Sequence, residues 1–278
     1  MTATRFRTLK QIVIGNKVSD GDGVQLTRVI GSRSLMMLDP FLLLDSFGTD
    51  KPQDYIGGFP PHPHRGFETV TYLLDGRMRH KDSEGNEGVI EPGGVQWMTA
   101  GSGIVHSEMP EQQEGLLHGF QLWVNLPAEF KMTAPAYQEF TADQITLERL
   151  DNGCEVRVIA GTTNKGSVGP VINDFVSPTY LDVAIPKGQV FEQEVAYDDN
   201  ALIYVINGEV LVDASSDLIG TGELGILEQG DAIQVTASED ARFLLVAGTP
   251  LNEPVVRGGP FVMNTQQELE QAFIDFQR

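Results

Sequence analysis

With 278 residues, the chain is long enough for two domains or for one large all-β unit. Its composition, 41% hydrophobic and 21% charged, is ordinary for a soluble globular protein. The formal net charge of −20 argues against direct binding to nucleic acid or to an anionic membrane, since both need a basic surface, but it leaves room for a basic protein partner.

The chain has one cysteine, Cys154, which excludes an intrachain disulfide and suits a reducing compartment. We expect Cys154 to be a small buried residue of a strand. The N-terminus lacks the basic-then-apolar pattern of a signal peptide, and no apolar run approaches membrane-spanning length. These features predict a cytoplasmic protein, or also a nuclear one if the source is a eukaryote.

Most of the chain has the pattern of short β-strands, for example at 69–74, 119–124 and 201–206. The 30 glycines and 15 prolines supply the turns between them. Short strands at regular spacing predict an antiparallel sandwich or barrel.

Two pairs of metal-ligand residues, His62 with His64 and His106 with Glu108, stand in this strand-like context. Residues i and i+2 of a strand project from the same face, so each pair can point into one cavity. Three imidazoles and a carboxylate suit a first-row transition ion and leave a coordination position open. We expect Fe(II), with Mn, Ni, Co and Zn as alternatives. Glu68 competes with Glu108 for the fourth position, because it follows His64 at a ligand-like spacing.

Five neighbouring residues are expected to have other roles. We expect Arg65 to form a structural ion pair, or else to hold a substrate carboxylate. His80 follows a hairpin in a polar stretch and is expected to be exposed. His118 begins a strand and is expected to lie outside the site, with support of a metal ligand as the alternative. Trp97 and Trp123 are expected to pack the barrel, with a pocket wall as the alternative.

The order of elements occurs twice, which indicates a duplicated β-domain. Residues 71–78 match 203–210, each an apolar strand that enters an Asp-Gly or Asn-Gly turn, and residues 88–94 match 225–231. The junction falls in 127–135, so we expect a metal-binding domain at 1–133 and a degenerate second domain at 134–278.

The second copy has no histidine where the first has its His-Pro-His motif. Glu192 and Glu194 stand there instead, and two lone carboxylates are a weak signal for a hard cation. We expect this copy to be structural or to form a partner surface.

One helix is predicted, at the C-terminus. Residues 265–268 fit a capping box, and Leu269, Ala272, Phe273 and Phe276 follow helical spacing. We expect this apolar stripe to pack on a sheet.

Five segments carry a resemblance to a known family. They are HPHRGFET at 62–69, PGGVQWMTAG at 92–101, GIVHSE at 103–108, LDPF at 38–41 and GPFVMNT at 259–265. Through them the chain resembles the pirin family of the cupin superfamily over its whole length.

The resemblance implies an all-β bicupin fold, with two antiparallel β-barrel (jelly-roll) domains, a C-terminal helix and iron in the first barrel. It places the metal ligands at His62, His64, His106 and Glu108, with Glu108 in preference to Glu68, and implies a second barrel without metal.

Two functions accompany this motif in the family. Some pirins are quercetin 2,3-dioxygenases, which open a flavonol ring with O₂ and release carbon monoxide. Others are regulators that act through a protein partner, as redox-sensitive transcription cofactors or modulators of metabolic enzymes. We therefore expect a dioxygenase for flavonol-like phenols in which Glu108 takes the substrate's hydroxyl proton, with a metal- and redox-sensing regulator as the alternative.

Overall fold

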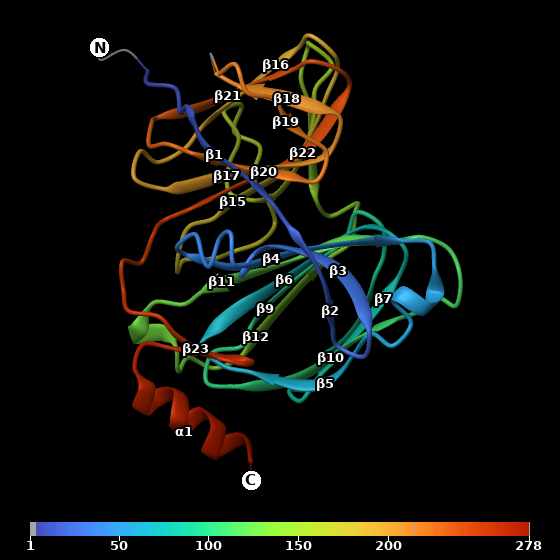
Figure 1. The fold of residues 1–278 in the computed structure, drawn as a ribbon, viewed down its shortest axis with the longest axis vertical. Helices are drawn as coiled ribbons and strands as arrows, with labels where there is room; N and C mark the ends of the chain where they lie inside the picture. Colours follow the sequence, from blue (N-terminus) through green and yellow to red (C-terminus); the bar gives the residue numbers. More distant parts are fainter. Residues whose placement is uncertain (1–3, 214, 278) are drawn as a thin grey trace. The chain divides into compact units, whose positions relative to one another are not determined.

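The computed structural model describes residues 4–213 and 215–277, and within these residues it contains a single α-helix, α1 (Gln266–Phe276) (Figure 1). The chain forms two compact units. We call residues 16–142 with 251–278 the histidine domain, and residues 1–15 with 143–250 the second domain.

The two domains exchange the ends of the chain, so their division differs from a single boundary at residues 133 and 134. Strand β1 (Leu9–Ile14) pairs with β20 (Glu223–Leu227) and so belongs to the second domain. Helix α1, expected in the second domain, belongs to the histidine domain. Strand β12 (Ala136–Phe140) extends the histidine domain past residue 133, because it pairs with β9 (Val95–Thr99).

The histidine domain is a jelly roll of two antiparallel sheets. Its seven-stranded sheet has the order β12-β9-β6-β11-β4-β3-β2, and its four-stranded sheet has the order β5-β10-β7-β8. The further strands are β2 (Asn16–Asp20), β3 (Val24–Ile30), β4 (Phe41–Thr49), β5 (Phe59–His64), β6 (Phe67–Asp75), β7 (Met78–Asp82), β8 (Glu87–Ile90), β10 (Ile104–Pro110) and β11 (Leu117–Asn125). A hairpin of β23 (Val256–Gly258) and β24 (Phe261–Met263) and two 3₁₀ turns, η1 (Pro52–Asp54) and η2 (Ala128–Phe130), complete it.

The second domain repeats this arrangement, with sheets of the order β1-β20-β17-β22-β15-β14-β13 and β16-β21-β18-β19. Its further strands are β13 (Thr146–Arg149), β14 (Glu155–Ala160), β15 (Thr179–Ile185), β16 (Val190–Glu194), β17 (Asn200–Asn207), β18 (Glu209–Val212), β19 (Ile219–Gly220), β21 (Ala232–Ala237) and β22 (Ala241–Gly248). The all-β bicupin prediction is confirmed, but both domains are two-sheet jelly rolls rather than closed barrels.

The predicted repeat is confirmed at one of its two alignments. Strands β6 and β17 occupy equivalent positions and enter turns at Gly76 and Gly208, whose φ angles are 84° and 80°. The alignment of 88–94 with 225–231 is wrong by one strand. The first segment runs from β8 into β9, whereas the second runs from β20, the counterpart of β9, into β21. The error arose because both segments are apolar strands that end in a glycine-containing turn.

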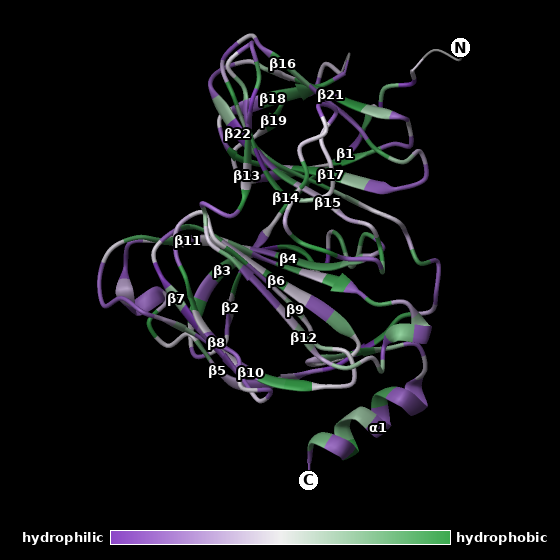
Figure 2. Ribbon diagram, turned by 180° about the vertical axis from the view of Figure 1, so that it is seen from behind, coloured by the Kyte–Doolittle hydropathy of each residue, from purple (hydrophilic) through white to green (hydrophobic). Residues whose placement is uncertain are grey.

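Helix α1 begins at the predicted capping box, in which Thr265 and Glu268 each bond the backbone N–H of the other. Leu269 and Ala272 are buried against Phe261 and Met263 of β24, which confirms the packing of the stripe. Hydrophobic and hydrophilic residues accordingly alternate along the helix (Figure 2). No helix in the described part of the chain is long and apolar enough to cross a membrane.

Candidate metal centre

Strands β5 and β10 bring three imidazoles together inside the histidine domain. The antiparallel register sets His106 opposite His62, and Ile104 opposite His64. One ring nitrogen from each of His62, His64 and His106 lies within 4.8 Å of the others. The same-face argument for His62 and His64 is thereby confirmed, and the second strand adds His106 to the cluster.

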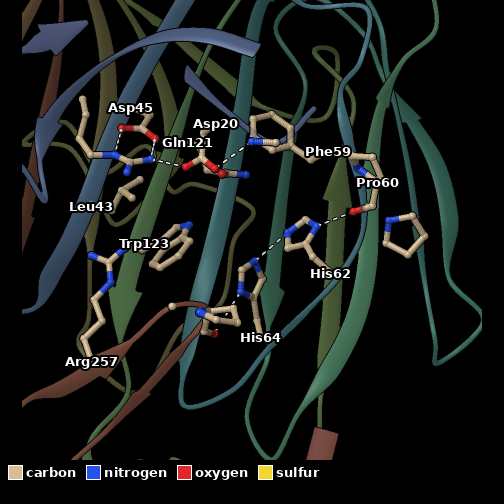
Figure 3. A pocket seen from close by; sticks show the side chains of 15 residues that line it. Asp20, Leu43, Asp45, Phe59, Pro60, His62, His64, Gln121, Trp123 and Arg257 are labelled. Atoms are coloured by element: carbon tan, nitrogen blue, oxygen red, sulfur yellow. Dashed lines mark hydrogen bonds and ion pairs between the residues drawn. The ribbon is translucent and has the colours of Figure 1, made fainter. Parts of the chain in front are cut away.

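Backbone carbonyls set the tautomers of two of these rings. His62 Nδ1 lies 2.8 Å from the oxygen of Pro60, and His64 Nδ1 lies 3.3 Å from the oxygen of Pro260 (Figure 3). Because a carbonyl oxygen only accepts hydrogen bonds, each Nδ1 carries the hydrogen and each Nε2 keeps a lone pair. This arrangement is common around metal-binding histidines.

The two Nε2 atoms face each other at 3.0 Å. Two lone pairs at this distance repel unless a cation lies between them. Two nitrogens that bind one metal ion at right angles lie about 3 Å apart, given metal–nitrogen distances of about 2.1 Å. The spacing therefore fits a shared metal ion.

His106 supports the same conclusion. Its side chain is buried, and neither ring nitrogen has a hydrogen-bond partner among the described residues. Burial, with the neighbouring His64 and His62, lowers the pKa of His106 well below its usual value, and burial lowers the pKa of His64 to about 3. Both rings are therefore neutral, which is the form that binds a metal ion.

Glu108 lies two residues after His106 in β10, and both of its carboxylate oxygens accept hydrogen bonds from other side chains. Thr71 Oγ1 donates to its Oε1 at 2.6 Å, and Gln121 Nε2 donates to its Oε2 at 2.7 Å. Glu68 is also buried and accepts a hydrogen bond from Thr99 Oγ1 at 2.8 Å. Among the described residues, only the three histidines meet as potential ligands, so a fourth ligand at Glu108 stays a prediction.

The expectation that His80 is exposed is wrong. Its side chain is fully buried, its ring centroid lies 5.3 Å from that of His106, and Gln96 Nε2 donates to its Nδ1 at 2.8 Å. Exposed and buried residues alternate along β7, so His80 points inward while Arg79 and Lys81 point to solvent. The two-residue period of a strand, applied to residues 78–82, predicts that the His80 side chain points inward.

A cavity of about 620 Å³ opens beside His62 and His64. Phe59 and Pro60 of β5 and Trp123 of β11 form apolar walls (Figure 3). Trp123 therefore lines the pocket, with its ring 5.1 Å from that of His64, whereas Trp97 packs in the interior as expected.

Part of the cavity wall is charged. Arg28 donates to both carboxylate oxygens of Asp45, at 2.9 and 2.7 Å, and to Asp20 at 2.7 Å. Burial raises the pKa of the Asp45 carboxyl, and the bonds from Arg28 act against that rise.

Arg65 and His118 have the structural roles expected of them. Arg65 Nη1 pairs with Asp275 Oδ2 of α1 at 2.8 Å, which confirms the predicted structural ion pair. His118 packs beside Phe120 and does not belong to the cluster.

The equivalent place in the second domain holds no imidazole. With residues 71–78 aligned to 203–210, the strand pairings set Gln193 of β16 and Ile233 of β21 where β5 and β10 pair His62 with His106, and they set Phe191 where Phe59 lies. Phe191 and Val235 are both buried in the core of that domain, together with Cys154. Glu192 and Glu194, the weak candidate for a second cation site, are exposed on the opposite face of β16.

Two jelly-roll domains, one with inward imidazoles and one filled by apolar residues, define a bicupin with one candidate metal centre. Residues 23–124 match the Pirin family, and residues 180–278 match the Pirin C-terminal cupin domain. The chain belongs to the pirin family.

Its relatives match it from end to end. A pirin-like protein from Caulobacter vibrioides is 56% identical over 272 residues, with 98% of each chain covered. Pirin from Homo sapiens is 44% identical over 270 residues, with 95% of this chain and 90% of the human one covered. A crystal structure of quercetin 2,3-dioxygenase from Acinetobacter baumannii is similar at a TM-score of 0.90 and 36% identity, covering 99% of this chain and 98% of the other.

Proposed function

We propose that this protein is a metal-dependent dioxygenase that opens the central ring of flavonol-type phenols, as quercetin 2,3-dioxygenases do. The observation that carries the proposal is the convergence of three imidazoles beside a cavity with aromatic walls. A volume of about 620 Å³ is ample for one planar phenol of drug-like size. The likeness to the Acinetobacter baumannii enzyme supports the same substrate class.

In this proposal His62, His64, His106 and Glu108 hold the metal. Fe(II) is the proposed ion, and Mn, Ni, Co and Zn suit the same donors, because affinity order alone does not select the occupant. When bound, the ion acts as a Lewis acid that lowers the pKa of the substrate hydroxyl and promotes reaction of the ring with O₂. Overall, the flavonol takes up both atoms of O₂, its ring opens and carbon monoxide leaves.

The protein's own groups bind the substrate and move its proton. Glu108 is the proposed base for the flavonol 3-hydroxyl. Thr71 and Gln121 hold its two oxygens and so fix the plane of the carboxylate, and the Thr71 hydroxyl can turn from donor to acceptor once Glu108 is protonated. Phe59 and Trp123 offer flat apolar surfaces that would orient the flavonol and exclude water.

The test measures oxygen uptake and loss of the flavonol absorption band with protein loaded separately with each of the five metals. His106→Ala removes one imidazole, and His118→Ala is the matched control outside the cluster. We expect turnover with at least one metal in the wild type and in His118→Ala, and none in His106→Ala. Metal binding at the cluster without turnover of any phenol would favour the regulator that acts through a protein partner.

The proposal places the protein in the cytoplasm. Its single cysteine is free and buried, as a reducing compartment allows. Detection of the tagged protein in fractionated cells tests this part.

A further inference from the structure

Arg257 presents a positive charge to the same cavity. It lies in β23 of the C-terminal hairpin, and its guanidinium carbon is 4.6 Å from the centroid of the Trp123 ring (Figure 3). Its one hydrogen bond to the described residues runs from Nη1 to the backbone oxygen of Leu42 at 3.3 Å, and no described carboxylate lies within ion-pair distance. Most of its five N–H groups therefore remain free to bind a ligand.

Arg28, the second arginine of the cavity, differs from Arg257 because it forms ion pairs with carboxylates. Arg28 binds Asp45 and Asp20, so its charge is balanced within the protein. Arg257 is held instead by an aromatic face, which orients a guanidinium without neutralising it. Burial and the nearby Arg28 lower the pKa of Arg257, while the charges of Asp45 and Asp20 act against that fall, and the guanidinium stays charged at any physiological pH.

Arg257 and the imidazoles flank the same aromatic wall. The Trp123 ring contacts the Arg257 guanidinium and also lies 5.1 Å from the His64 ring, and Figure 3 shows it between them. A planar ligand with one end at His62 and His64 can therefore extend along this wall toward Arg257. An anionic oxygen at the far end of the ligand would meet a guanidinium that forms no ion pair with the described residues.

We propose that Arg257 forms an anion subsite that selects aromatic substrates with a second, anionic oxygen remote from the ring oxygen presented to the imidazoles. The oxygen belongs to a carboxylate or to an ionised phenol. This inference rests on the proposed function for its substrate class, but the subsite is a binding property of the cavity and has a test of its own.

The first experiment measures binding of naphthoate, an aromatic carboxylate that is not a flavonol, to metal-depleted protein by calorimetry. Arg257→Gln removes the charge. Arg257→Lys keeps the charge without the planar fork, and Arg33→Gln removes an exposed arginine that does not line the cavity. We expect Arg257→Gln to weaken binding about tenfold or more, Arg257→Lys to weaken it less, and Arg33→Gln to match the wild type. Thermal unfolding of each variant checks that the fold is retained.

The second experiment compares flavonols on metal-loaded protein. Flavonol without other hydroxyls should bind wild type and Arg257→Gln equally, while a flavonol with a carboxylate on its B ring should lose about tenfold in the variant. A hydroxylated flavonol and its methyl ether distinguish an ionised phenol as the source of the anion.

The outcomes separate the two proposals. Naphthoate that does not bind the wild type, or that binds Arg257→Gln equally well, overturns the subsite, as does equal weakening of the charged and uncharged flavonols. Binding of naphthoate that depends on Arg257, together with no turnover of any flavonol, leaves the subsite standing and rejects the dioxygenase.

Discussion

His62 and His64 direct their Nε2 atoms at each other across 3.0 Å, while the Nδ1 of each faces a backbone carbonyl oxygen. Their hydrogens are thus committed away from the gap, and the two lone pairs meet inside it. His106, with no hydrogen-bond partner for either nitrogen among the described residues, lies against both rings. This geometry fits a shared metal ion, and it is the basis of the functional proposal.

Gln121 is expected to position the Glu108 base and also to contribute to stability. Gln121→Leu removes the donor to Glu108 Oε2, so we expect kcat for a flavonol to fall about tenfold to a hundredfold. The free energy of unfolding should fall by about 1–3 kcal/mol, the cost of a buried acceptor left without its donor. Steady-state kinetics and urea unfolding measure the two effects. Gln25→Leu, on the exposed face of β3, is the control, and equal rates in both variants would contradict this role.

Lys131 is expected to be a buried structural cation. Its Nζ donates to Gly66 O, Asn125 Oδ1 and Val262 O at 2.7, 2.7 and 3.0 Å, and so joins the turn between β5 and β6 to the C-terminal hairpin. Lys131→Met leaves three buried acceptors without this donor, so we expect a loss of about 2–4 kcal/mol in the free energy of unfolding. Urea unfolding at neutral pH measures it. An unchanged midpoint would exclude the structural role.

Lys131 also predicts a pH dependence. Burial lowers its pKa from 10.5 to about 8, so between these values the unfolded chain binds more protons than the folded one. Stability contributed through this group therefore rises with pH from about 8 to 10.5, as the cost of the buried charge disappears. The difference in free energy of unfolding between wild type and Lys131→Met, measured across this range, should increase with pH. A difference that is flat or falls would show that the ammonium is not penalised by burial.

Phe191 is expected to serve packing alone. It lies in β16, the counterpart of β5, packs in the core of the second domain and is 2% exposed. Phe191→Ala should cost about 3–5 kcal/mol through lost burial and the cavity left behind. Metal content and turnover of the folded fraction should not change. Loss of metal from this variant would show that the second domain contributes to the centre.

The strands and the histidine spacing were predictable from local pattern, because alternation and the two-residue period of a strand depend only on neighbours in the chain. The oxygen that holds His64 Nδ1 was not, since Pro260 lies 196 positions away and reaches His64 only through the C-terminal hairpin. The place of Arg257 in the cavity was not predictable either, because its contact with Trp123 also depends on the C-terminal hairpin. The exchange of chain ends between the domains depends on the pairing of β1 with β20, for which no local signal exists.

The measurement that tests the central claim most directly is the metal content of protein purified without added metal, determined by elemental analysis for wild type, His106→Ala and His118→Ala. We predict close to one first-row transition ion per chain in the wild type and in His118→Ala, and little or no metal in His106→Ala, which lacks one of the three imidazoles. Equal metal content in all three proteins, or none in a wild type that also fails to bind added Fe(II), would contradict the claim that these three imidazoles form a metal centre.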